Sequence, residues 1–409
     1  MTEQHDVVIV GGGIMGATAL FEFARRGVEA LLLEGEPAFG GRDSSKTAGI
    51  IRTHYSNPEV VRMAIRGRAI FGELPRFSGA APVFHETGYI FLSPPEILDR
   101  SRENVVMQRS QGAVVEELPA SALPDFAPGM GWEGIGAIFH EPGSGYVDPV
   151  PAANGFIAAA QADDGVARAG VHVERLLTKD GAVVGVETAD GPILCRDVVL
   201  AAGAGSQAIA ATAGLALPIT YSVEQEVLVL GHAGDAPRVP ISNAIDAVYL
   251  RPELSGPVPG HGRAEGRAVG RADGRAVLLG RGFPKDYPPG DPSNYPEQVA
   301  RRDLTDDLLR HVARRNPTLA TAPVLEAKVA LYDITPDWHP LLGRTTELPG
   351  LILITGGSGH GFKLAPAFAE MVAAEYCGEP VGYAEVAHFS LDRFARGETF
   401  GSAYGGNRA

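Results

Sequence analysis

The first regular pattern in the chain is the apolar run DVVIV at residues 6–10, which ends at a row of glycines. A short run with β-branched residues predicts a strand buried on both faces of a parallel sheet. From Ile14 to Arg26 the apolar residues recur with helical spacing, and Gly27 stands where a glycine ends a helix. A second apolar run, VEALLL, leads to Glu34. This order of strand, glycine turn, helix and strand predicts a βαβ unit.

The same pattern of apolar strands and helices returns later in the chain. A helical run over 151–162 precedes the strand-like VHVERLL, GAVVGVET and VVLAAGAGS. Near the C-terminus, GLILITGGSGHGFKLAPAFAEMVAAEY predicts a strand, a glycine-rich turn and an amphipathic helix. Alternating strands and proline turns occupy residues 80–145 and 220–320 instead. We therefore expect a second domain that is threaded through the first.

A short repeat interrupts the strand-rich region at residues 220–320. Residues 262–275 read GRAEGRAVGRADGR, between the strand candidates DAVYLRPE and RAVLLGRGF. A four-residue period fits no solenoid unit, which needs at least about 20 residues. We expect an expanded, solvated hairpin loop over 255–275 and a flexible tail over 397–409.

Composition narrows the class of protein. The chain has 409 residues, of which 45% are hydrophobic and 21% charged, and this suits a globular protein with room for a large cofactor. A net charge of -14 argues against a nucleic-acid partner. The cysteines, Cys195 and Cys377, make neither a disulfide framework nor a multi-thiolate metal site, so we expect no metal and a reducing compartment. No apolar run approaches a membrane span, and we expect a cytoplasmic protein.

The glycine turn has the spacing of a dinucleotide-binding fingerprint. Gly11, Gly13 and Gly16 fit G-x-G-x-x-G, and Glu34 lies 21 residues after Gly13. The first glycine permits a tight turn, the second lets the backbone approach a pyrophosphate, and the third allows close helix–strand packing. Glu34 would accept hydrogen bonds from ribose hydroxyls and would repel a 2′-phosphate, which disfavours NADP. The fingerprint leaves NAD and FAD open.

Further motifs carry a family resemblance. Together with the fingerprint, SSKTAGIIR at 44–52, VVLAAGAGS at 198–206, ALYDITPDWHPLLG at 330–343 and TGGSGHGFKLAP at 355–366 resemble the FAD-dependent amine oxidase family of monomeric sarcosine oxidase, glycine oxidase and the D-amino-acid dehydrogenases. The order and spacing of the motifs match along nearly the whole chain. The resemblance implies an α/β fold, α+β overall, with a Rossmann-like FAD-binding domain and a discontinuous substrate domain on a mainly antiparallel sheet.

The resemblance also assigns segments and cofactor contacts. The FAD-binding domain is expected to comprise residues 1–80, 146–219 and 321–396, and the substrate-binding domain residues 81–145 and 220–320. The expected FAD contacts are Gly11, Gly13, Ile14, Met15, Gly16, Glu34, Ser44, Ser45, Lys46, Thr47, Val173, Ala202, Gly203, Gly357, Gly359, His360, Gly361, Phe362 and Lys363. A helix that begins near Lys363 would direct backbone NH groups at the ring edge that becomes negative on reduction.

Two cations are expected to bind a substrate carboxylate. By resemblance, Arg52 and Lys363 hold this group above the flavin, and a charge-assisted hydrogen bond contributes about 1.5–3 kcal/mol. Arginine offers a bidentate fork and lysine a point charge. Tyr332 and Tyr249 are the candidates for ring walls or hydroxyl donors around the substrate amine.

The sequence departs from the family pattern at three positions. Ala330 stands where covalent sarcosine oxidase-like enzymes have the flavin-linking cysteine, so we expect non-covalent FAD. Leu278 aligns with the oxidase-type lysine that promotes reaction with oxygen, which makes a dehydrogenase plausible. Gly49 replaces an arginine beneath the flavin.

These observations predict FAD-dependent oxidation of the C–N bond of a small amino acid or N-substituted amino acid. The expected chemistry is hydride transfer to flavin N5 followed by hydrolysis of the imine, with O2 or another electron acceptor, and it requires no assigned general base. Two alternatives remain: a flavin dehydrogenase subunit that passes electrons to a partner subunit, and a nonenzymatic FAD-binding protein. The sequence names neither the substrate nor the oligomeric state.

Overall fold

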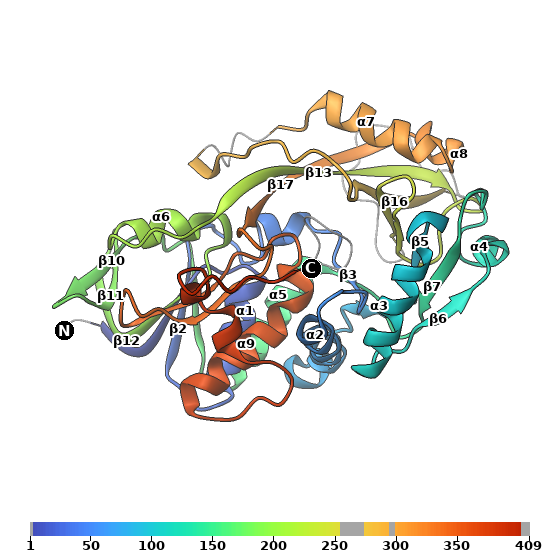
Figure 1. The fold of residues 1–409 in the computed structure, drawn as a ribbon. Coiled ribbons are helices and arrows are strands. Elements are labelled where there is room, and N and C mark those ends of the chain that lie inside the picture. The colour runs from blue at the N-terminus through green and yellow to red at the C-terminus, as the bar shows by residue number, and fades with distance from the viewer. Residues whose placement is uncertain (1–2, 254–273, 294–298, 402–409) are drawn as a thin grey trace, which may run out of the picture.

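The computed structural model describes residues 3–253, 274–293 and 299–401. Most of the predicted repeat loop and the end of the predicted tail lie outside the described residues. Two large sheets dominate the rest, and Figure 1 shows one of them beside the N-terminus and the other arching over it toward the opposite end of the molecule.

The first sheet has a parallel centre. Each strand is hydrogen-bonded in parallel to the next in the series β9 (Val166–Ala169), β2 (Ala30–Glu34), β1 (Glu3–Val10), β12 (Gly191–Leu200) and β19 (Leu351–Thr355). Antiparallel strands extend it: β18 (Leu341–Arg344) beside β19, and the hairpin of β10 (Val173–Lys179) and β11 (Ala182–Thr188) beside the start of β12. The predicted βαβ unit is therefore present, with β1 and β2 as neighbours.

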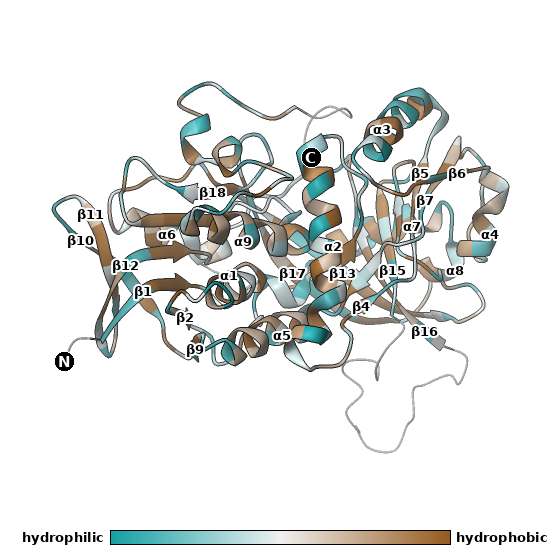
Figure 2. Ribbon diagram, turned by 90° about the horizontal axis from the view of Figure 1, so that it is seen from below, coloured by the Kyte–Doolittle hydropathy of each residue, from teal (hydrophilic) through white to brown (hydrophobic). Residues whose placement is uncertain are grey.

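Helices cover one face of this sheet. They are α1 (Ile14–Ala24), α5 (Pro149–Ala162) and α9 (Gly361–Cys377), and α2 (Pro58–Ser78) packs on α5 and α9. Every residue of α1 is buried, because α5 and α9 pack against it, and this explains why the helix is apolar on nearly all sides. Figure 2 shows the same contrast, with apolar residues along α1 and the central strands and polar residues on the outer side of α2.

Local sequence signals set the ends of these helices. The side chain of Asn57 accepts hydrogen bonds from the backbone NH groups of Glu59 and Val60 and so caps α2, which ends at the left-handed Gly79. The helix α9 begins at Gly361, two residues before the expected start, and ends at the left-handed Gly378. The position of the α9 N-terminus matters for the site described below.

The second sheet is mainly antiparallel. Its order is β17 (Val324–Ile334), β13 (Thr220–His232), β16 (Gly274–Arg281), β15 (Val248–Pro252), β14 (Ile241–Asn243), β5 (Tyr89–Ser93), β7 (Ala137–Glu141) and β6 (Glu116–Leu118). Only β14 and β5 pair in parallel among these described strands. Helices α7 (Arg302–Ala313) and α8 (Pro317–Ala320) lie over its outer face, where Leu308, Val312 and Leu319 join its core (Figure 1).

Smaller elements connect the sheets. A three-stranded sheet joins β3 (Ile50–Ile51), β8 (Gly145–Val147) and β4 (Phe84–His85). The other helices are α3 (Leu98–Ser110), α4 (Leu123–Phe126) and α6 (Ser206–Ala211), with 3-10 turns at Asp43–Lys46, Pro95–Ile97, Ala120–Ala122, Gly203–Gly205, Val386–Phe389 and Leu391–Arg393. In the part of the chain that the structure describes, no helix is long and apolar enough to cross a membrane, and no cluster of side chains suits a metal ion.

The two sheets draw on alternating parts of the chain, as the sequence predicts. One segment differs: the sequence assigns residues 321–396 to the FAD-binding domain, but β17 pairs with β13 from Val324 to Ile334 and so lies in the second sheet. The apolar pattern of β17 fits either sheet, and only its hydrogen-bonded pairing with β13 assigns it to the second one. The exact domain boundaries stay a prediction.

Candidate active site

A large cavity of about 650 Å³ lies at the carboxyl ends of β1, β2 and β12. Ligands of parallel α/β sheets bind at this edge. The expected cofactor contacts that line it are Gly11, Gly13, Ile14, Met15, Glu34, Ser44, Thr47, Val173, Ala202, Gly203, Gly357, Gly359, Gly361 and Phe362. The structure therefore brings together residues from six parts of the chain.

The fingerprint glycines have distinct structural reasons. Gly11 has a φ of +106°, and a Cβ there would lie 2.6 Å from the carbonyl oxygen of Ala201. Gly16 does not line the cavity; a Cβ on it would lie 1.8 Å from the carbonyl oxygen of Gly11. Gly16 thus lets α1 pack on the turn, the role that the third glycine is expected to have.

Glu34 closes one end of the cavity. Its Oε2 accepts a hydrogen bond of 2.6 Å from the backbone NH of Gly12, and its Oε1 accepts one of 2.7 Å from the NH of Glu36. Both bonds fix the carboxylate at the end of β2, beside the glycine turn. A carboxylate in this position is suited to ribose hydroxyls.

Only part of the SSKT segment at residues 44–47 lines the cavity. The hydroxyl of Ser44 accepts a hydrogen bond of 3.0 Å from the backbone NH of Ile14 in the first turn of α1. Thr47 lines the cavity as well. Ser45 donates to the carbonyl oxygens of Gly41 and Arg42, and neither Ser45 nor Lys46 lines the cavity.

Sequence reasoning missed several residues of this cavity, among them Arg42, Asp43, Val171, His172 and Asp333. Asp333 orders the glycine-rich turn, because its Oδ2 accepts a hydrogen bond of 2.9 Å from the NH of Gly356. Burial raises the pKa of Asp333 to about 6. Asp333 stands inside the motif ALYDITPD, so a signal was present. Val171 and His172 begin the strand-like VHVERLL but precede β10 in the structure, and a strand pattern does not by itself indicate a cofactor contact.

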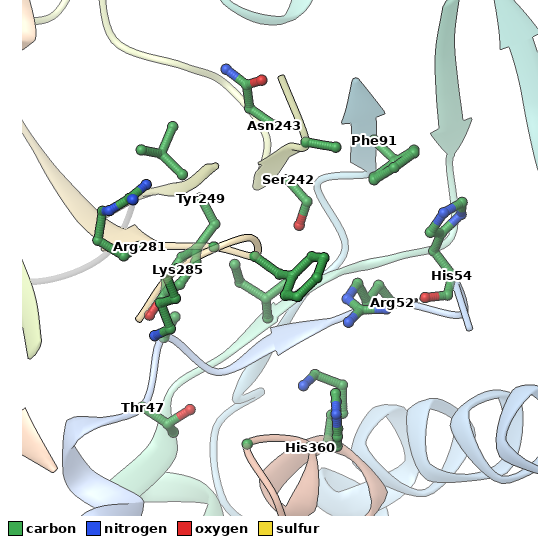
Figure 3. A pocket seen from close by; sticks show the side chains of 18 of the residues that line it. Thr47, Arg52, His54, Phe91, Ser242, Asn243, Tyr249, Arg281, Lys285 and His360 are labelled. Atoms are coloured by element: carbon green, nitrogen blue, oxygen red, sulfur yellow. Dashed lines mark hydrogen bonds between the residues drawn. The ribbon is translucent and has the colours of Figure 1, made fainter. Parts of the chain in front are cut away.

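A second cavity of about 200 Å³ adjoins the first. Thr47, Tyr332 and Gly359 line both of them. The predicted residues Arg52, Tyr249, His360 and Lys363 line only the second. Figure 3 shows this cavity with Arg52 and His54 on one side, Arg281 and Lys285 on the other, and His360 beside Arg52.

Arg52 is held firmly at this wall. Its Nη1 donates a hydrogen bond to the carbonyl oxygen of His54, and its Cζ lies 4.4 Å from the centroid of the Tyr55 ring. A guanidinium stacked on an aromatic ring has a restricted orientation. Arg52 therefore presents a preorganised donor to the cavity.

Lys363 lies in the first turn of α9 and lines the same cavity. Burial, and then the charge of Arg52, lower the pKa of Lys363 to about 7. His360 caps the same helix, and burial followed by the charges of Lys363 and Arg52 lowers the pKa of this histidine too. An anion bound between Arg52 and Lys363 would restore the charge of the lysine.

The two expected tyrosines line different parts of the cavity. Tyr332 packs on Gly359, where a Cβ would lie 2.5 Å from the ring. Tyr249 donates a hydrogen bond of 2.7 Å to Oε1 of Glu226. Burial raises the pKa of both phenols, so they are hydroxyl donors near neutral pH.

Several lining residues were not predicted, namely His54, Tyr89, Phe91, Glu226, Arg281, Lys285, Tyr287 and Trp338. Glu226 had a signal, since it is an acid inside the apolar strand segment EQEVLVL. His54 follows the SSKTAGIIR motif closely. Arg281, Lys285 and Tyr287 follow the repeat, where the sequence offers no motif.

The three departures have clear positions. Leu278 of β16 pairs with Leu228 of β13 and is buried in the core, and Ala330 of β17 lies opposite Glu224 of β13. Gly49 has a φ of +62°, and a Cβ on it would lie 2.3 Å from the carbonyl oxygen of Val147. The backbone at Gly49 therefore requires glycine, which explains why no arginine stands there.

Fold and site together define a class of protein. A dinucleotide cavity at the edge of a parallel sheet opens into a cation-lined cavity under an antiparallel sheet, the arrangement of a two-domain oxidoreductase. Residues 6–375 match the FAD dependent oxidoreductase family, and the chain belongs to this family. FAD is its cofactor, and the fold and cofactor expected from the sequence are confirmed.

Individual relatives are distant. 4-Methylaminobutanoate oxidase (formaldehyde-forming) of Paenarthrobacter nicotinovorans is 24% identical over 90% of this chain, which spans 43% of that protein. Sarcosine oxidase subunit beta of Rhodobacter capsulatus is 24% identical over 97% of this chain and 90% of its own length. The crystal structure of L-proline dehydrogenase from P. horikoshii has a TM-score of 0.85, 24% identity and coverage of 98% of this chain and 100% of its own, which shows the shared fold.

Proposed function

We propose that this enzyme oxidises the C–N bond of a small amino acid or N-substituted amino acid. The observation that carries the proposal is the pair Arg52 and Lys363, which line one small cavity that adjoins the FAD cavity. A carboxylate bound by both cations would place the neighbouring carbon near the flavin. The relatives named above act, by their names, on 4-methylaminobutanoate, sarcosine and L-proline, which are all amino acids.

Each residue has a distinct part in this proposal. FAD accepts the hydride when it is bound. Arg52 and Lys363 hold the carboxylate, Tyr332 and Tyr249 provide aromatic and hydroxyl contacts, and the α9 N-terminus directs positive potential at the ring edge. Phe91, Tyr89 and Trp338 reduce access of water to the cavity.

The test is anaerobic reduction of the flavin by a panel of amino acids and N-methyl amino acids, followed by absorbance. Bleaching by one compound class identifies the substrate. Arg52→Ala and Lys363→Met should each raise KM by about 10- to 100-fold, as expected for loss of a charge-assisted hydrogen bond. Arg102→Ala is the matched control, because Arg102 is exposed, pairs with Glu117 and does not line the cavity. Full turnover in both cavity variants, with FAD retained, would rule out the carboxylate site.

A second proposal concerns the electron acceptor. By resemblance, Leu278 occupies the position of the oxidase-type lysine, and a buried leucine there favours a dehydrogenase, alone or as the flavin subunit of a larger assembly. Hydrogen peroxide at one equivalent per turnover in air would establish an oxidase. Dye reduction without peroxide would establish a dehydrogenase. If no compound of the panel reduced the flavin, the nonenzymatic FAD-binding alternative would be favoured.

A further inference from the structure

Glu226 is a buried acid that the proposed function does not use. Its Oε1 accepts hydrogen bonds from the Tyr249 hydroxyl at 2.7 Å and from the backbone NH of Ala48 at 3.1 Å. Its Oε2 is buried and has no hydrogen-bond partner among the described residues, and the side chain lines the second cavity. An unpartnered, buried carboxylate oxygen at a cavity wall is energetically costly, so its presence calls for an explanation.

The sheet explains how the pair forms. Gly280 lies opposite Glu226 on one side and opposite Tyr249 on the other. A Cβ at Gly280 would lie 2.1 Å from the Tyr249 ring, so the ring lies over this glycine and reaches the carboxylate. The geometry is therefore built across three strands, and it depends on a residue without a side chain.

The position of Glu226 and Tyr249 points to the bound flavin, rather than to Arg52 and Lys363, as the group on which they act. Ala48 follows Thr47, which lines both cavities. Figure 3 shows Tyr249 on the side of Arg281 and Lys285, opposite Arg52. Glu226 thus lines the second cavity, and its hydrogen bond from the Ala48 NH places its carboxylate next to the residue after Thr47, which borders both cavities.

Charged and titratable groups face Glu226 from each neighbouring element. Lys328 lies opposite it on β17, and Arg251 and Tyr249 approach from β15. Tyr332 of β17 is close enough to feel its charge, while β16 presents Gly280 and the segment before β3 presents a backbone NH. Glu224, on the same strand, already binds Lys285 and Ser222.

The balance of these groups leaves the carboxyl able to change charge near neutrality. Burial raises the pKa of Glu226 to about 7, although Tyr249, Arg251, Lys328 and the Ala48 NH each lower it in part. A negative charge placed next to this carboxylate would raise the pKa further. A flavin ring that gains electrons is such a charge.

We propose that Glu226 couples proton uptake to reduction of the flavin: its carboxylate takes up one proton when a flavin bound beside it becomes negative. The proton comes from solvent and converts the carboxylate to a carboxylic acid, while both electrons pass from the reductant to the ring and none to the protein. The inference rests on FAD binding in the first cavity, and it does not depend on the identity of the substrate.

The consequence is a measurable linkage. Between the pKa of Glu226 beside the oxidised ring and its higher pKa beside the reduced ring, reduction by two electrons should take up one proton at the ring and a second at Glu226. The flavin midpoint potential should therefore fall with pH about twice as steeply as in a protein in which this carboxyl is absent.

The experiment is a spectroscopic redox titration of the holoenzyme with a chemical reductant and a reference dye, from about pH 5.5 to about pH 9. The wild type should show the steeper slope above neutrality, and Glu226→Gln should lose it. Glu224→Gln is the matched control on the same strand and should keep it. Equal slopes in the wild type and Glu226→Gln would overturn the inference.

A second variant covers the case in which Glu226→Gln fails to retain FAD. Tyr249→Phe removes one donor to the carboxylate, which raises the pKa of Glu226 further, so the change in slope should move to higher pH. An unmoved change in slope would contradict the proposal. Since the reductant is chemical, these results are independent of whether any amino acid reduces the flavin, and failure of the proposed substrate class would be seen separately.

Discussion

The backbone NH of Thr53 donates a hydrogen bond of 2.7 Å to Oε2 of Glu141. The same oxygen accepts a bond of 2.6 Å from the Ser144 hydroxyl, and Glu141 is 1% exposed. A buried carboxylate from the second sheet thus fixes the chain directly after Arg52. Glu141 does not line the second cavity, so we expect it to position Arg52 through the backbone.

Glu141→Ala should therefore disturb binding as well as stability. Loss of the buried acceptor should lower the free energy of unfolding by about 1–3 kcal/mol and raise KM for a carboxylate substrate, with kcat at saturation less affected. Thermal unfolding and steady-state kinetics measure the two effects. Glu141→Gln keeps an acceptor and should recover part of both, and the exposed Glu116→Ala serves as control. A lower Tm with unchanged KM would mean that Glu141 has no role in positioning Arg52.

Substrate affinity should depend on pH through Lys363. The pKa of this lysine is lowered from 10.5 to about 7, so the free enzyme loses the charge as pH rises through neutrality. A bound carboxylate stabilises the charged form, and KM should therefore rise above about pH 7. Lys363→Arg keeps the charge and should give a flatter profile. A wild-type KM that is constant across this range would contradict the assignment of Lys363.

The same shift has a consequence for stability. The pKa of Lys363 is lower in the folded protein than in the unfolded chain, so between about pH 7 and pH 10.5 the unfolded state binds more protons. This residue alone makes the protein more stable as pH rises through that window. Comparison of urea midpoints for the wild type and Lys363→Met should show a difference that narrows toward high pH, and a constant difference would argue against it.

Gly49 should tolerate alanine poorly. Its φ is +62° and a Cβ would lie 2.3 Å from the carbonyl oxygen of Val147, so strain and a clash act together. Gly79 has a similar φ of +67° with open space around its Cβ, and Gly79→Ala isolates the cost of the backbone conformation, which is about 1 kcal/mol. Gly49→Ala should lower the free energy of unfolding by clearly more than Gly79→Ala. Equal losses in Tm would show that the Val147 carbonyl moves away freely.

Glu34 should determine FAD affinity. Glu34→Gln removes the charge that is expected to face the ribose and weakens the bond to the Gly12 NH, so FAD should dissociate about 10- to 100-fold more readily. Ultrafiltration and flavin fluorescence measure the released cofactor. Glu29→Gln, at an exposed acid just before β2, is the control.

The wild type should release yellow FAD on acid precipitation, as expected for a chain with alanine at position 330.

The sequence alone was sufficient for the first βαβ unit, the fingerprint and the family. These features depend on local order: a buried strand, a turn that demands glycine, and an acid at the end of the next strand appear within 34 residues. The motifs containing Arg52, Tyr332 and Lys363 could be recognised for the same reason, since each includes its own local pattern.

Only the tertiary structure decided which residues meet. Glu226, Tyr249 and Ala48 come from separate parts of the chain, and strand register together with the missing side chain at Gly280 brings them together. Glu141 likewise meets the backbone after Arg52 only in the folded protein. The strand β17 joins the second sheet only through its pairing with β13. Contacts between distant segments depend on register and packing, and the alternation of apolar and polar residues along one strand does not contain that information.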